Sequence, residues 1–199
     1  MNKKIVVISM ITLLALGFAL GNSMTSTSID DSVSAVYHTS VCKQVIRANG
    51  EVEDLGCNHN LLPMSGRALL QQILGGINTA ATSALNMTIA NCTGGGATQP
   101  NVTDTKLCGK GSSAMEYNTG QCGMGPVVAT YYNFTGNVAG LPGWNITNTF
   151  TSTCNDVIVN ATALYNTTTQ LFAENTFTTV TLQNGDQLNV TWGIWVTGS

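Results

Sequence analysis

The C-terminal stretch Asp186-Gln-Leu-Asn-Val-Thr-Trp-Gly-Ile-Trp-Val-Thr-Gly-Ser199 alternates between apolar and polar residues, and it decides the fold class. Successive side chains of a β-strand point to opposite faces of the sheet. One face of this segment is therefore apolar; it consists of Leu188, Val190, Trp192, Ile194 and Val196. The other face carries Trp195 and the glycosylation sequon at Asn189, which needs access to solvent. We predict a strand at the edge of a β-sandwich or barrel, with Trp192 in the core and Trp195 exposed.

Turn signals and alternation predict further strands and one helix. Asn49-Gly50 is a strong signal for a hairpin, here between strands 41–48 and 51–57. An apolar stripe that follows Ser65 and stops at Gly75-Gly76 predicts a helix over 65–75, with Ser65 as its N-cap. Other strands are expected at 84–90, 126–135, 144–152, 156–165 and 176–182, and a long loop region at 92–125. The expected fold is all-β, a sandwich of jelly-roll or Ig-like type with one short helix.

The first 21 residues have the pattern of a secretory signal peptide. Lys3 and Lys4 precede an uncharged apolar run from Ile5 to Leu20, and Ala19-Leu-Gly21 supplies small residues for cleavage. The run is shorter than the roughly 20 residues that a membrane span needs. We therefore expect cleavage after Gly21, with membrane contact only through the leader before cleavage. The mature chain then consists of a tail over 22–36 and one domain over 37–199.

The composition of the mature chain indicates its partners. It keeps five basic and ten acidic residues, a net charge near −5, which argues against binding to nucleic acid. Charged residues make up only 9% of the chain, compared with about 25% in ordinary soluble domains. A surface with so few charges needs another source of solvation, and N-linked sugar would supply it. Eight Asn-x-Thr sequons occur, and all eight are candidate glycosylation sites: Asn86, Asn91, Asn101, Asn133, Asn145, Asn160, Asn166 and Asn189.

Six cysteines, all after the leader, are typical of an oxidising compartment. Counting outward from the Asn49-Gly50 turn places Cys42 opposite Cys57, within disulfide reach. Cys92 and Cys108 would close a loop of moderate length, and Cys122 with Cys154 would complete the set by elimination. Six cysteines allow fifteen pairings, so other connectivities remain open.

Motifs for catalysis or metal binding are weak throughout the sequence. Residues 109–113 lack the spacing of a phosphate-binding loop. The carboxylates at 51, 53 and 54 are expected to protect a sheet edge. Two histidines, His38 and His59, lie near no zinc-like cysteine spacing. Lys106 or Lys110 beside an asparagine could form an isopeptide crosslink, but nothing in the sequence favours it. We expect a protein that is not an enzyme, with no cofactor and no metal.

Two blocks of sequence resemble a known kind of domain. The first block consists of Gly50-Glu-Val-Glu-Asp-Leu-Gly56, Asn60-Leu61 and Ser65-Gly-Arg-Ala-Leu-Leu70. The second runs from Leu171-Phe-Ala-x-Asn-x-Phe177 through Val180-x-Leu-x-x-Gly-Asp186 to Val196. Together they resemble a β-rich domain of virion structural proteins and archaeal surface proteins. With the leader and the sequons, the chain is similar to the subunits of extracellular archaeal filaments of the thread or bundling-pilus type, although its cysteines depart from that pattern.

This resemblance implies assembly by donor-strand complementation, in which the N-terminal strand of one subunit completes the sheet of the next. Residues 22–36 would be that strand, with Ile29, Val33 and Val36 in the acceptor groove; a disordered linker is the other interpretation of this tail. The implied protein is a homopolymeric, glycosylated cell-surface filament with a role in adhesion or cell–cell contact. Two alternatives stay open: a virion structural protein, such as a capsid decoration or tail fibre, and a secreted carbohydrate-binding module in which Trp195 stacks on sugar.

Overall fold

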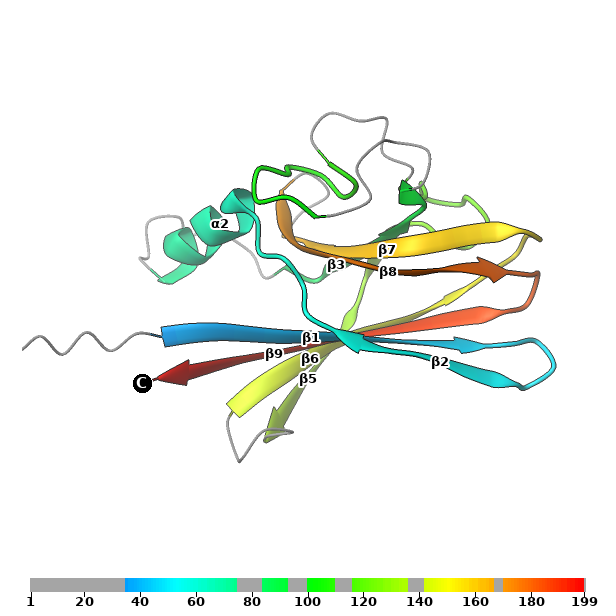
Figure 1. The fold of residues 1–199 in the computed structure, drawn as a ribbon, viewed down its shortest axis with the longest axis horizontal. Helices are drawn as coiled ribbons and strands as arrows, with labels where there is room; N and C mark the ends of the chain where they lie inside the picture. The colour runs from blue at the N-terminus through cyan, green and yellow to red at the C-terminus, as the bar shows by residue number, and fades with distance from the viewer. Residues whose placement is uncertain are drawn as a thin grey trace, which may run out of the picture. The chain divides into compact units, whose positions relative to one another are not determined.

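The computed structural model describes residues 35–74, 84–92, 100–109, 116–135, 142–166 and 170–198. Two antiparallel sheets form the two layers of this part of the chain, so the predicted all-β sandwich fold with one short helix is confirmed (Figure 1). One sheet has the strand order β2-β1-β9-β6-β5 and the other has the order β4-β3-β7-β8. The residue ranges of the elements are β1 Ala35–Ile46, β2 Val52–Asn58, α2 Met64–Leu74, β3 Asn86–Ala90, β4 Val127–Val128, β5 Thr130–Thr135, β6 Pro142–Thr151, β7 Val157–Tyr165, β8 Leu171–Leu182 and β9 Gln187–Gly198.

The C-terminal strand β9 is a central strand, and the prediction that it forms an edge is wrong. It pairs with β1 over its whole length, from Ala35↔Gly198 to Ile46↔Gln187, and with β6 on its other side. Alternation along one strand shows which face is buried, but it does not show whether one or two neighbours pair with the backbone. The predicted faces are nevertheless confirmed, since Trp192 is fully buried and Trp195 lies on the opposite face, stacked on His38 with ring centroids 5.7 Å apart.

The core lies between the two sheets. Each sheet contributes apolar side chains from alternate positions of its strands, and together they form one buried cluster. From the first sheet come Val41, Val45, Ile146, Phe150, Leu188, Val190, Trp192 and Ile194, and from the second Met87, Ile89, Val159, Leu164, Val180 and Leu182. The contiguity of this cluster is the reason that the two sheets behave as one domain.

The hairpin β1–β2 brings Cys42 opposite Cys57, as predicted, although the register near the turn differs. Arg47 and Glu51 flank a three-residue loop, closed by the bond from the Arg47 amide to the Glu51 carbonyl at 2.8 Å. This loop shifts the pairing by one residue from the expected register, to Ile46↔Val52. A bulge between Lys43 and Gln44 then restores it, and Gly56 accommodates the bulge with a φ of 74°.

The helix α2 packs against β8, and its start differs from the prediction. The helix begins at Met64, after Pro63. The Ser65 hydroxyl does not act as an N-cap acceptor; it donates to the Leu171 carbonyl at 2.8 Å and so joins the helix to β8. Gly66 lies directly against β8, because a Cβ there would be 1.9 Å from the Phe172 carbonyl oxygen. The helix therefore needs both residues to approach the sheet this closely.

All three disulfide pairings that the sequence suggested are present. Cys42 bonds to Cys57, Cys92 to Cys108 and Cys122 to Cys154. The last of these joins the segment before β4 to the connection between β6 and β7. The Cys122–Cys154 bond thereby ties the segment before β4 to the sandwich, and the Cys92–Cys108 bond holds residues 100–109 near the end of β3.

Candidate functional site: the edges of the sheets

The outer strands of the two sheets determine how this domain can pair with another chain, because an unpaired strand exposes backbone donors and acceptors. Strands β2 and β5 end the first sheet, and β4 and β8 end the second. These four edges differ in how far the chain itself covers them.

The edge of β8 is occupied by other parts of the same chain. Leu61 exchanges two backbone hydrogen bonds with Glu174, at 2.9 and 3.1 Å. Farther along, the Asn58 side chain donates to the Thr176 carbonyl at 2.9 Å, and Arg47 donates to the Thr181 carbonyl at 2.8 Å. These donors satisfy carbonyls that an incoming strand would otherwise use. The edge of β8 is therefore protected.

The edges of β2 and β4 are protected by other means. Strand β2 carries Glu53 and Asp54, and Arg47 binds Glu53 at 2.5 Å, so two of the three carboxylates predicted to guard an edge lie on one, whereas Glu51 lies in the loop before it. Strand β4 has only two residues. Beside it, the next part of β3 is covered by a bridge between Ala90 and Glu116 and by the bond from the Tyr117 amide to the Ile89 carbonyl, at 3.2 Å.

In the described part of the chain, no strand pairs with the outer edge of β5. Its six residues, Thr130–Thr135, contain no charge and pair only with β6 among the described strands. Two of its tyrosines are largely exposed, Tyr131 at 48% and Tyr132 at 54%, and the neighbouring Val128 is 75% exposed. A regular, uncharged strand with exposed aromatic side chains is the kind of edge to which a further strand adds.

A groove of about 610 Å³ lies between the segment after β2 and strand β8. Its lining is mostly polar and includes Asn58, His59, Asn60, Leu61, Pro100, Asn160, Asn175, Thr176, Phe177 and Thr179. His59 reaches the Thr39 carbonyl from here, at 2.9 Å. Two residues that line the groove, Asn58 and Phe177, also contact the side chain of Lys43, a residue not predicted from the sequence.

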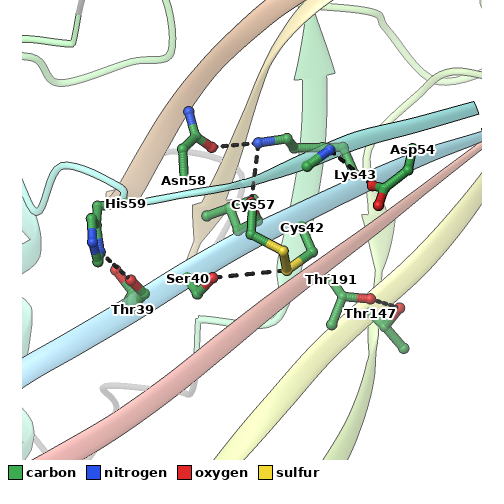
Figure 2. The surroundings of a disulfide bond; sticks show 12 residues. Thr39, Ser40, Cys42, Lys43, Asp54, Cys57, Asn58, His59, Thr147 and Thr191 are labelled. Atoms are coloured by element: carbon green, nitrogen blue, oxygen red, sulfur yellow. Dashed lines mark hydrogen bonds between the residues drawn. A yellow bond between two sulfur atoms is a disulfide. The ribbon is translucent and has the colours of Figure 1, made fainter. Parts of the chain in front are cut away.

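Lys43 is a lysine on the buried face of β1, between Val41 and Val45, and it is only 2% exposed. Its Nζ donates to the Val41 carbonyl at 3.0 Å and contacts Oδ1 of Asn58, as Figure 2 shows. The Phe177 ring centroid lies 5.4 Å from Nζ. Burial lowers the pKa of Lys43 to about 8, and the negative charge of Asp54 opposes that shift. The signal in the sequence was its place in the alternation Val41-x-Lys43-x-Val45.

Glu174 is a second buried ionisable group, in β8 at 1% exposure. Burial, together with the hydrogen bond and negative charge of Asp104, raises its pKa to about 9. Asp104 is itself buried and accepts the Asn101 amide at 2.8 Å. Protonated Glu174 therefore fastens the loop 100–109 to the second sheet.

We expect the stability of the folded protein to fall as the pH rises from about 4.5 to about 9. The folded state holds the Glu174 proton more tightly than the unfolded chain, so this stabilisation is fully present below pH 4.5 and is lost as the pH passes through the folded pKa. Glu174→Gln should remove this part of the pH dependence, whereas exposed Glu51→Gln should not. Urea unfolding at several pH values measures it, and an equal slope in Glu174→Gln and wild type would contradict the assignment.

The eight predicted glycosylation sites differ in how far their asparagine side chains are exposed. Asn101 and Asn133 are exposed, and Asn86, Asn91, Asn145 and Asn189 are partly exposed. Asn160 and Asn166 are each only 8% exposed, and the Asn160 side chain accepts the Cys92 amide at 2.7 Å. These two asparagines are therefore much less accessible to a glycan in the folded domain than the other six.

The predicted donor strand is only partly within the described residues. Ile29 and Val33 lie outside them. Val36 lies in β1, where its backbone pairs with Thr197 of its own chain. The pairing between β1 and β9 begins with Ala35 opposite Gly198, so residues from 35 onward already pair within the same subunit. The segment left to act as a donor is therefore 22–34.

Comparisons with known proteins identify no relative. No protein-family model matches the chain, and neither the curated proteins nor the solved structures contain a match. Among the described residues, no helix is long and apolar enough to cross a membrane. Within the same residues, no group of three or more His, Cys, Asp or Glu side chains is arranged to hold a metal ion.

Proposed function

We propose that this protein is the subunit of an extracellular, glycosylated filament in which residues 22–34 of one subunit pair with strand β5 of the next. The observation that carries the proposal is the β5 edge, which is uncharged, six residues long and unpaired in the described part of the chain. Three disulfides and six accessible sequons suit a protein that works outside the cell.

The donor segment is long enough for this role. Thirteen extended residues span about 40 Å, whereas pairing along the six residues of β5 needs about 20 Å. The remaining length allows the segment to cross from one subunit to the next. A contact between two different surfaces of the subunit, repeated without closing into a ring, produces a filament.

The chemistry of the segment fits an edge that contains no charge. Residues 22–34 are rich in Ser and Thr, and their apolar members are Met24, Ile29 and Val33. Backbone hydrogen bonds would provide most of the affinity, and these three side chains would pack beside Tyr131 and Val128. Asp30 and Asp31 would remain in solvent.

Deletion of residues 22–34 from the mature protein should abolish filaments. Electron microscopy and sedimentation of secreted protein measure the outcome. A matched control replaces the same thirteen residues with a Gly/Ser segment of equal length, which retains the reach of the tail and removes its side chains. Filaments of normal appearance from both variants would contradict the proposal.

A charge on the β5 edge should also block assembly, and the structure offers a matched control. Tyr132 in β5 and Val52 in β2 are both 54% exposed and both lie on edge strands. We expect Tyr132→Lys to prevent filament formation and Val52→Lys to leave it unchanged, because a lysine opposes strand addition only where addition occurs. The reverse pattern would assign the docking edge to β2.

A further inference from the structure

We propose that Lys43 and Asn58 become joined by an intramolecular amide bond between Nζ and Cγ, formed by the protein itself with release of ammonia. The crosslink would connect β1 to the end of β2, next to the Cys42–Cys57 disulfide (Figure 2). This inference does not depend on the proposed filament.

The two side chains are already in contact. Asn58 pairs with Val41 across the hairpin, and Lys43 is two residues farther along the same buried face of β1. The Nζ of Lys43 touches Oδ1 of Asn58, as the dashed line in Figure 2 shows. The atom to be attacked, Cγ, is bonded to that oxygen. Formation of the bond therefore requires a small rotation of one side chain and no movement of the strands.

The Asn58 amide is held in a fixed orientation. Its Nδ2 donates to the Thr176 carbonyl at 2.9 Å, which directs the nitrogen toward β8 and leaves the carbonyl side facing Lys43. Lys43 is held as well, by its bond to the Val41 carbonyl at 3.0 Å. Two groups fixed in contact react far faster than the same groups free in solution, because the entropy of bringing them together has been lost on folding.

The surroundings also favour the neutral form of the amine, which is the form that attacks. Lys43 is almost completely buried, and the Phe177 ring lies beside its ammonium group. Its lowered pKa leaves about a tenth of the molecules with a neutral Lys43 at pH 7. Within the described residues no carboxylate forms an ion pair with Nζ, and the negative charge of Asp54 only partly opposes the effect of burial.

The reaction balances without any added reagent. The lone pair of neutral Nζ attacks Cγ, and the bond between Cγ and Nδ2 breaks. One of the two Nζ protons passes to Nδ2, which leaves as ammonia, and the other remains on the new amide. Asn58 is exposed and lines the polar groove, so water can carry the proton and ammonia can escape.

The mass of the mature protein tests this inference. After removal of sugars, reduction and alkylation of all six cysteines, the chain should be lighter than its sequence mass by one ammonia molecule. Peptide mapping should then find the Lys43 and Asn58 peptides joined, with no tryptic cleavage after Lys43. Lys43→Met and Asn58→Ala should each restore the full mass, and Lys106→Met, at an exposed lysine, should retain the deficit.

Two results would overturn it. One is a wild-type chain of full sequence mass in which trypsin cleaves after Lys43. The other is a loss of ammonia confined to the Asn58 peptide, since a succinimide at Asn58 has the same mass deficit without a crosslink. Both results come from the wild-type protein, so the test does not depend on whether a variant folds.

Discussion

Replacement of Trp192 by alanine should lower the free energy of unfolding by about 3–5 kcal/mol. Trp192 is fully buried in the central strand β9, among side chains from both sheets. Its removal leaves a cavity that the disulfide-bonded strands around it cannot fill by collapse, because interiors are close-packed and relax only in part. Chemical denaturation with all three disulfides intact measures the change.

Trp195 provides the control for this prediction. It is three residues farther along β9 on the opposite face, where it stacks on His38. Trp195→Ala should cost less than about 1 kcal/mol, because the side chain borders solvent and leaves no closed cavity. Equal losses in the two variants would mean that the two faces of β9 have been assigned incorrectly.

Loss of the Cys122–Cys154 disulfide should destabilise the protein by about 3–4 kcal/mol, the value expected for a closed loop of some thirty residues. The bond spans 32 residues, twice the separation of either other pair, and both cysteines pack against the main core. A double serine variant, compared with wild type by thermal unfolding, gives the measurement. An unchanged melting temperature would contradict this role.

The Cys42–Cys57 pair gives an informative contrast. Its loop has a separation of 15, and chain entropy alone predicts a loss of about 3 kcal/mol on removal. If Lys43 and Asn58 are joined, the same hairpin keeps a covalent link of nearly equal span. The double serine variant at 42 and 57 should then lose much less stability than the one at 122 and 154.

The sequence predicted features that depend on neighbouring residues. The alternation in β9 assigned Trp192 and Trp195 to the correct faces, and Asn49-Gly50 located the first hairpin. The cysteine pairing of that hairpin was correct because two deviations cancel: the loop is one residue longer than expected, and the bulge at Lys43 compensates for it. Such compensation between a turn and a bulge leaves no clear pattern in the sequence.

Features that depend on distant parts of the chain could not be predicted in this way. The central place of β9 results from its pairing with β1, which is about 150 residues away in the chain. The raised pKa of Glu174 depends in part on Asp104, which lies about 70 residues earlier in the chain. The protection of the β8 edge comes from single side chains, Asn58 and Arg47, whose targets become apparent only when the sheets are assembled. Lys43 was also not predicted, although the alternation of Val41, Lys43 and Val45 in the sequence already placed it on an apolar face.

Electron cryo-microscopy of the native filament is the most direct test of the proposed assembly. We expect residues 22–34 of each subunit to lie as an added strand beside Thr130–Thr135 of the next subunit, in the same sheet as β6. Their presence beside β8 or β2, or native material that consists only of separate subunits, would contradict the proposed assembly.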